Sequence, residues 1–292
     1  MSPSLQFIIV KYKDKIIESV SDYLLWVKET NQVEDISDEG QSICFENSNV
    51  YYRGQSCSHW ELKPSVFREP ILDEHSLVNK ASLKLWNEVS SLKSYLEKMT
   101  FFQHYGLCTR LLDVTFNPLV ALYMACCEDN QNKCDGVVFC GHGTERRDNR
   151  IAELTAKYVF ENELQPMVLG FHSFVNAQKA NVDSFTQPLF ILPPINNPRI
   201  EAQNGAFVMA PLIDKVIDEG TPLLNRKSLD GTEFFDERRA IIKGSNKESI
   251  LCELSLLGID NGTIYKGIEE KLKAIVIEEK WKTNKYNNRI IL

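Results

Sequence analysis

The chain lacks three features that would assign it to common classes. No apolar run reaches the roughly 18 residues of a membrane-spanning helix, and residues 1–10 have neither the basic region nor the cleavage site of a secretory signal. Positive charge is also in short supply, with 33 Lys and Arg against 40 Asp and Glu and a net charge of −7. That balance disfavours broad nonspecific binding to nucleic acid. We therefore expect a cytoplasmic protein that does not use a membrane.

Metal and disulfide signatures are absent as well. The chain has eight cysteines, but none form a Cys-x-x-Cys pair, so we interpret them as reduced thiols that lie mostly in the core. The spacing of residues 126–142, which contain four cysteines and His142, fits no common structural zinc site. Cys108 has no evident base beside it, which argues against a nucleophile. The sequence predicts no metal.

The chain also shows no internal repeat, no low-complexity segment and no Pro/Gly-rich linker. A hydrophobic content of 43% and a charged content of 25% are typical of a globular protein. We therefore predict a single α+β domain over residues 1–292. Its core spans about 50–210, with a helical N-terminal lead-in at 1–45 and a helical C-terminal segment at 247–292.

Hydrophobic periodicity predicts both helices and strands. The helix that opens at Pro118 is apolar almost all round, so we expect it to be buried. Residues 219–236 are predicted to be a polar loop. The predicted helices are 15–29, 76–102, 118–128, 151–163, 247–257 and 266–280, and the predicted strands are 50–53, 136–140, 188–192, 205–209 and 238–243.

Polar side chains gather in two short stretches of otherwise apolar sequence. Buried polar groups are costly unless they are paired, so these stretches indicate a binding site or an internal hydrogen-bond network. Structural alternatives exist for most members: Arg53 could pair with Asp113, Arg110 could bridge Asp113, His104 could be a core histidine and Gln103 could cap a helix. The stretches comprise Arg53, Gly54 and Gln55, then Gln103, His104, Tyr105 and Gly106, running into Thr109, Arg110 and Asp113.

These motifs resemble the FRG domain family. The first block is Arg53-Gly54-Gln55 with residues 62–68, the second is 102–113 with 117–123, and the third is Arg199 to Gln203 with Gly205 and Phe207. The resemblance covers about residues 50–208, and the second block is the most specific. Cys108 and Val114 depart from the family pattern, although neither removes a polar group.

The resemblance implies a fold like that of the ADP-ribosyltransferases, a split β-sheet with surrounding helices that binds NAD in a central cleft. The implied reaction moves ADP-ribose from NAD to a macromolecule through an oxocarbenium-like transition state. Arginine suits the diphosphate, a glycine permits close approach, and an aromatic ring stacks on nicotinamide. The residues assigned to NAD binding are Arg53, Gly54, Gln55, Gln103, Tyr105, Thr109, Arg110, Arg199 and Phe207.

The catalytic group is harder to assign. Many transferases place a glutamate where this chain has Gln203, and an amide cannot act as a base. The candidates for the missing carboxylate or base are Glu201, Asp113 and His104.

The resemblance leaves two functions open. The first is a mono-ADP-ribosyltransferase that modifies a nucleic acid or a protein, as a bacterial toxin or phage-defence effector, with an antitoxin or regulatory protein as a further partner. The alternative is a non-catalytic module that binds a nucleotide, RNA or a protein at the same place.

Overall fold

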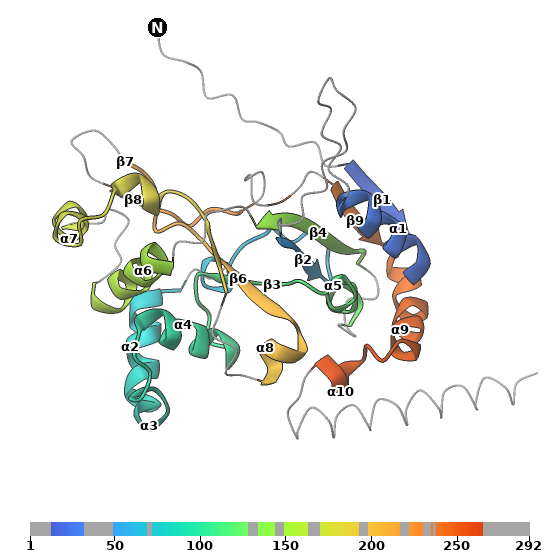
Figure 1. Ribbon diagram of the computed structural model, residues 1–292, viewed down its shortest axis with the longest axis horizontal. Helices are drawn as coiled ribbons and strands as arrows, with labels where there is room; N and C mark the ends of the chain where they lie inside the picture. The colour runs from blue at the N-terminus through green and yellow to red at the C-terminus, as the bar shows by residue number, and fades with distance from the viewer. Residues whose placement is uncertain are drawn as a thin grey trace, which may run out of the picture.

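The computed structural model describes residues 13–31, 49–68, 72–127, 134–143, 149–162, 170–192, 198–216, 222–229, 235 and 238–264. Its centre is a seven-stranded mixed sheet with the order β1-β9-β4-β2-β3-β6-β5, flanked by helices (Figure 1). Among the strands of this sheet that the structure describes, β1 and β9 alone pair in parallel. Two further strands, β7 (Ile213–Val216) and β8 (Pro222–Leu224), form a separate hairpin. The sheet strands are β1 (Lys13–Ile17), β2 (Asn49–Gln55), β3 (Leu111–Thr115), β4 (Gly136–Gly143), β5 (Leu189–Ile191), β6 (Gly205–Met209) and β9 (Arg238–Ile242).

The helices fall into two groups, one over the half of the sheet that contains β1 and the other over the half that contains β5 (Figure 1). One group contains α1 (Val20–Asn31), α5 (Pro118–Cys126), α9 (Lys247–Leu256) and α10 (Asn261–Ile264). The other contains α2 (Glu74–Lys84), α3 (Trp86–Val89), α4 (Tyr95–His104), α6 (Asn149–Glu161) and α7 (Phe171–Ala177). The short helix α8 (Pro198–Ala202) precedes β6, and 3-10 turns occupy Ser65–Phe67, Val182–Phe185 and Gly244–Asn246. The α+β class is therefore confirmed.

The two faces of the sheet are packed differently. One face carries a single apolar cluster that runs from β9 to β5, including Ile241, Phe139, Leu112 and Phe190. The helix-covered face carries two clusters. The first joins β9, β4 and β2 to α1, α5 and α9, and the second joins β3, β5 and β6 to α4, α6 and α7. The boundary between the two helical clusters therefore lies between β2 and β3.

The pairing of β2 with β3 is also the weakest junction of the central strands. Strand β2 pairs with β4 over seven residues, and β3 pairs with β6 over five. Between β2 and β3 the register contains one pair, Tyr52 with Thr115. We call this boundary, where residues 52–54 face 113–115, the seam. The sheet is divided there both by its backbone pairing and by its helical packing.

Helix α5 packs directly on the backbone of β2 and β4. Asn117 caps it by accepting a hydrogen bond from the Leu119 N–H, and Pro118 occupies the first turn. A Cβ on Gly54 would lie 1.9 Å from the carbonyl oxygen of Ala121, and one on Gly136 would lie 2.3 Å from that of Ala125. Glycine at both positions is what allows this helix to approach so closely. The prediction of a buried helix here is confirmed, since six of its nine residues are buried.

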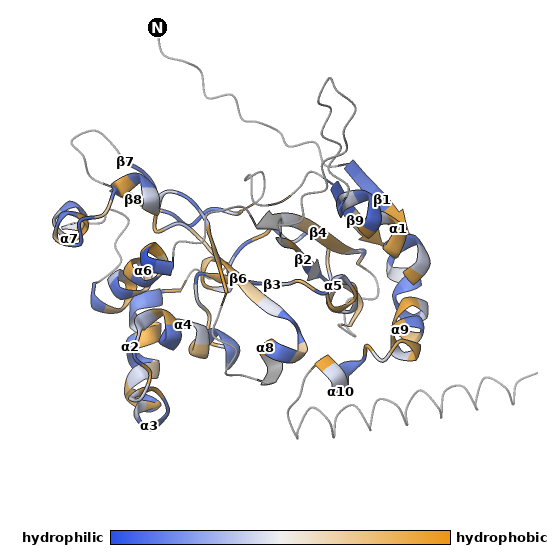
Figure 2. Cartoon of the chain, in the orientation of Figure 1, coloured by the Kyte–Doolittle hydropathy of each residue, from blue (hydrophilic) through white to orange (hydrophobic). Residues whose placement is uncertain are grey.

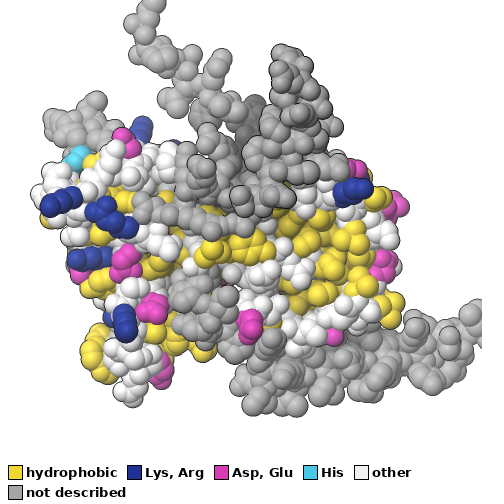
Figure 3. Space-filling view, viewed as in Figure 1, with side chains coloured by type: hydrophobic (Ala, Val, Ile, Leu, Met, Phe, Trp, Pro, Cys, Tyr) yellow, Lys and Arg dark blue, Asp and Glu magenta, His cyan; other side chains and the backbone are white. Residues whose placement is uncertain are grey.

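Hydropathy follows this packing. Strand β1 changes from hydrophilic to hydrophobic along its length (Figure 2), and its last residue, Ile17, is buried. On the face shown in Figure 3, the Lys and Arg side chains of the described residues lie mainly towards the end formed by α2, α6 and α7, and hydrophobic side chains occupy the middle. None of the helices in the described ranges is both long and apolar enough to span a bilayer.

Several predicted elements need correction. Helix α1 begins at Val20, and Lys13–Ile17 form a strand beside β9, so the N-terminal lead-in is not wholly helical. The predicted helix over 76–102 is three helices, α2, α3 and α4, because Leu85 leaves helical geometry and Ser94 caps a new start. Strands β3, β7 and β8 and helix α7 were not predicted. The predicted helix at 266–280 lies outside the described residues.

Candidate functional site

A polar network lies at the seam and is centred on Asp113. Its carboxylate Oδ2 accepts a hydrogen bond of 2.9 Å from Gln103 Nε2. Gln103 Oε1 in turn accepts 2.7 Å from the hydroxyl of Thr109, which is fully buried. The side chain of Asp113 is 48% exposed. A carboxylate is thus anchored from inside the protein and presented to solvent at the boundary of the two helical clusters.

Arg53 completes the network from the other strand. Its Nη1 donates 3.0 Å to the main-chain carbonyl of Asp113 and lies 3.9 Å from the carboxylate Oδ2. This side chain therefore bonds a β3 carbonyl near the one place where β2 and β3 pair. The Arg53 side chain is 15% exposed, so it is not sealed in the core. The structural alternative of an Arg53–Asp113 pair is confirmed, in a form that leaves the carboxylate accessible.

Gln203 lies between α8 and β6 and contacts Thr115, the last residue of β3. Its carbonyl accepts a 2.5 Å hydrogen bond from the Thr115 hydroxyl, and Asn204, the next residue, has a left-handed φ of +44° and accepts from the Phe116 N–H at 3.0 Å. Thr115 and Asp113 are two residues apart and share a face of β3. The side-chain Nε2 of Gln203 is buried and has no hydrogen-bond partner among the described residues. Such a donor costs about 1–3 kcal/mol unless a ligand or water satisfies it.

His104 and Tyr105 stand at the C-terminal end of α4, next to Gln103. Their rings meet edge-on with centroids 4.8 Å apart. Tyr105 is 66% exposed, which leaves its ring open to stacking. Gly106 follows with a φ of +88°, so the glycine of this motif ends the helix in a left-handed conformation.

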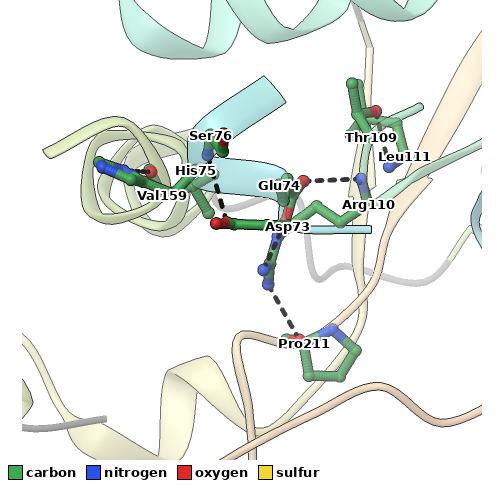
Figure 4. Close-up of polar contacts among 9 residues, drawn as sticks. All are labelled: Asp73, Glu74, His75, Ser76, Thr109, Arg110, Leu111, Val159 and Pro211. Carbon is green, nitrogen blue, oxygen red and sulfur yellow. Dashed lines mark hydrogen bonds and ion pairs between the residues drawn. The ribbon is translucent and has the colours of Figure 1, made fainter. Parts of the chain in front are cut away.

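Arg110 does not belong to this site, which corrects its assignment to NAD binding. It is 0% exposed, and its side chain donates from Nε at 2.9 Å and Nη2 at 2.7 Å to Glu74 Oε2, as Figure 4 shows. Its main-chain N–H donates to Glu74 Oε1 at 2.8 Å, and Nη1 reaches the Pro211 carbonyl at 3.2 Å. With its charge and donors engaged in the core, Arg110 holds α2 against β3. The suggested bridge to Asp113 is also wrong.

Four other predicted NAD-binding residues are buried. Gly54 faces α5 as described above, so its lack of a side chain permits the approach of that helix; a role of its backbone in holding nicotinamide stays a prediction. Phe207 is 4% exposed within the cluster around α4 and α6, and therefore cannot stack on a ligand at the surface. Thr109 acts through Gln103. Gln55 is 3% exposed, and its Oε1 has no partner among the described residues.

The third motif is only partly described. Glu201 is exposed in α8, and its carbonyl accepts from the Asn204 N–H at 3.1 Å. Arg199 belongs to α8, but its side chain is outside the described residues, so its role stays a prediction. Of the predicted residues, the structure brings Arg53, Gln103, Thr109 and Asp113 into one network. The main chain of Gln203 contacts Thr115, the last residue of β3.

A second cluster lies just beyond the end of β2. The structure joins Cys57 and Cys134 in a disulfide, which corrects the expectation that all cysteines are reduced thiols. The Nδ1 atom of His59 is 3.7 Å from the sulfur of each cysteine. These three side chains lie at one end of the β2–β4 pairing, because Cys57 and His59 follow β2 and Cys134 precedes β4. The sequence spacing gave no sign of them.

Sequence reasoning also missed Glu74 and Thr115. Both are ordinary in their local context, and their roles arise from contacts with Arg110, 36 residues away, and with Gln203, 88 residues away. No local pattern reports such contacts. A capping signal was present near Glu74, because Asp73 accepts from the Ser76 N–H at the start of α2.

Comparison with known families supports the resemblance. The family model of the FRG domain matches residues 48–134, which include β2, the 3-10 turn at Ser65–Phe67, α2 to α4, β3 and α5. Over this stretch the chain is therefore similar to the FRG domain. No curated protein matches the chain, and neither does any solved structure.

Proposed function

We propose that the protein is an ADP-ribosyltransferase that uses NAD and modifies a macromolecular acceptor, with the seam as its active site. The observation that carries this proposal is the anchored, half-exposed carboxylate of Asp113 at the point where the sheet divides. A split sheet is what the family resemblance implies, and the seam is divided in both its hydrogen bonding and its packing.

Asp113 takes the role that Gln203 cannot fill. NAD supplies a nicotinamide–ribose bond whose cleavage develops positive charge on the ribose. A carboxylate beside that charge stabilises it, and it can also accept the proton of an attacking hydroxyl or amine. Gln103 and Arg53 orient the Asp113 carboxylate through the contacts of 2.9 and 3.9 Å. In this scheme Asp113 is the catalytic residue, and Gln103 is a positioning residue.

Gln203 supplies a donor. Its buried Nε2 without a described partner suits the oxygen of a ribose hydroxyl, which would satisfy it. Tyr105 offers an exposed ring for stacking. Arg53 keeps a 15% exposed side chain through which its guanidinium can also contact a phosphate. His104 and Glu201 remain candidates for handling the acceptor.

One observation favours the second candidate, a module that binds a nucleotide without turnover. The Oδ2 atom of Asp113 already accepts from Gln103 and lies near Arg53, so one oxygen of this carboxylate is engaged within the protein, as suits a group that only holds a ligand. RNA is less well supported as the ligand. Binding of its phosphates needs a continuous basic surface, and on the face shown in Figure 3 the basic side chains of the described residues do not extend across the apolar middle.

The test uses NAD labelled in its ADP-ribose part. The full chain is incubated with the label and a cell lysate, followed by nuclease or protease, and free nicotinamide is measured in parallel. We expect label in one class of macromolecule and its loss in Asp113→Asn. Asp183→Asn, an exposed aspartate at the far 3-10 turn, is the matched control and should retain activity.

Two outcomes would contradict the transferase. Equal labelling by wild type and Asp113→Asn would remove Asp113 from catalysis. The binding module would be established in its place by three results together: no label in any macromolecule, no release of nicotinamide, and NAD binding that Arg53→Lys weakens.

A further inference from the structure

We propose that Cys57, Cys134 and His59 form a zinc site when the two cysteines are reduced. The disulfide is then the oxidised form of this site, and it excludes the metal. This inference does not depend on the proposed transferase.

The three ligand atoms are already close to the arrangement that zinc requires. The two sulfurs and the imidazole nitrogen lie within 4.8 Å of one another, and His59 Nδ1 is 3.7 Å from each sulfur. Ligand atoms about 2.0–2.3 Å from a tetrahedral zinc ion are separated by roughly 3.5–3.8 Å. The histidine is thus at ligand distance from both cysteines, and only the sulfur–sulfur bond has to open.

The backbone holds the two cysteines together without the disulfide. Strands β2 and β4 stay in register up to Gln55 and Val137, and the Ser58 N–H donates 2.7 Å to the Asp135 carbonyl. Lys247, 1% exposed, donates 2.7 Å to the carbonyl of Ser56. Each cysteine is therefore adjacent to an anchored residue, so reduction leaves both thiols in place.

The residue that follows Cys134 is also held in place. The carboxylate of Asp135 accepts 2.7 Å from Lys243 Nζ and 3.0 Å from the Gly244 N–H. That carboxylate is engaged and does not supply a fourth ligand. Three protein ligands with one position left for water is the arrangement of zinc sites that stay open. Thiolate and imidazole together select zinc over magnesium or calcium.

Oxidation and metal release form one balanced step. The two zinc-bound thiolates each lose one electron and join as the Cys57–Cys134 bond. A low-molecular-weight disulfide takes up both electrons and leaves as two thiolates, which are protonated, and zinc dissociates because its sulfur ligands are gone. The reduced thiols expected from the sequence correspond to the metal-binding form.

Cobalt titration tests the site. The metal-free full chain, reduced with a phosphine and kept anaerobic, is titrated with Co²⁺, and thiolate-to-cobalt charge-transfer absorption is recorded. We expect one cobalt per chain, displaced by one equivalent of Zn²⁺. His59→Ala should weaken binding about 100-fold or more, since few ligands share the affinity. Cys252→Ser and His172→Ala, both at exposed positions, should bind as wild type does.

His59→Ala also separates a metal site from a purely structural disulfide. His59 is exposed, so the variant should fold, and it should still form the Cys57–Cys134 bond, read by mass spectrometry of the linked peptides. Oxidised glutathione should release zinc from the wild type as that bond forms. The proposal is overturned if the reduced chain gives no charge-transfer band, or if His59→Ala and Cys57→Ser both leave the band unchanged.

Discussion

Two arginine–carboxylate pairs come from the same set of motifs and serve different purposes. Arg110 and Glu74 are 0% and 2% exposed and make two side-chain hydrogen bonds to each other. Arg53 and Asp113 are 15% and 48% exposed and approach to 3.9 Å. The first pair fixes α2 on β3, and the second leaves an oriented carboxylate at the seam. Burial of the acid, more than the presence of arginine, separates a structural pair from a candidate site.

The largest effect should come from breaking the buried pair. Glu74→Gln leaves a guanidinium uncompensated in the core, and loss of one partner of a buried pair costs about 3–5 kcal/mol. The free energy of unfolding, measured by urea denaturation, should fall by that amount. The double variant Glu74→Met, Arg110→Leu should regain part of the loss, because it removes both charges. A loss below about 1 kcal/mol would contradict the structural role.

The next-largest effect is expected at Gly54, the residue that follows Arg53. Gly54→Ala places a methyl group where the Ala121 carbonyl lies, at 1.9 Å, and forces α5 away from β2. Overpacking of this kind costs about 1–3 kcal/mol, measured as the midpoint shift in urea. Gly106→Ala is the control for space, since a Cβ there meets nothing within 4 Å; its cost should come only from its positive φ. If Gly54→Ala is neutral, the close approach of α5 is wrong.

Breaking the exposed pair of Arg53 and Asp113 should lower the free energy of unfolding less than breaking the buried pair does. Asp113→Asn keeps the shape of the side chain, and the contact that it weakens is partly exposed. The free energy of unfolding should therefore change by less than about 1 kcal/mol. Under the proposed function, transfer of ADP-ribose should nevertheless fall about 100-fold or more. A loss of stability like that of Glu74→Gln would make this pair structural and remove the contrast between the two.

A third pair, on the surface, extends the comparison to pH. The hydrogen bond from Lys243 lowers the pKa of Asp135 below its ordinary value of 3.8. A lowered pKa in the folded state stabilises the protein above the ordinary value, and this contribution is lost as pH falls through the lowered value. The melting temperature should therefore drop on acidification by slightly more in wild type than in Asp135→Asn. Identical pH profiles would show that the pair contributes nothing.

The sequence predicted the class of fold and part of the site. The apolar run after Asn117-Pro118 was sufficient for α5, because local capping and burial agree there. It was not sufficient for the break within 76–102. Three- and four-residue spacing continues through Leu85 and Leu92, although Ser94 and Glu97 carry a capping signature: the Glu97 N–H donates to Ser94, and Glu97 accepts from the Lys93 N–H.

The rest depends on contacts between distant segments. Strand β1 exists because it pairs with β9, some 225 residues later, and its polar first residues resemble a helix start. Arg53 and Arg110 look alike in sequence, because the glutamate that neutralises Arg110 lies outside its motif. Cys57 and Cys134 meet only through the register of β2 with β4. Motifs thus predicted which residues matter, and tertiary packing decided what each one does.

The weak junction between β2 and β3 has a practical consequence for dissecting this chain. The stretch recognised as the FRG domain ends at residue 134, before β4 begins and long before β6, yet these are the strands that bond β2 and β3 along their lengths. Excised alone, it would hold two strands with open edges, and such edges invite aggregation. The segment that the family model matches is therefore smaller than the unit that we expect to fold.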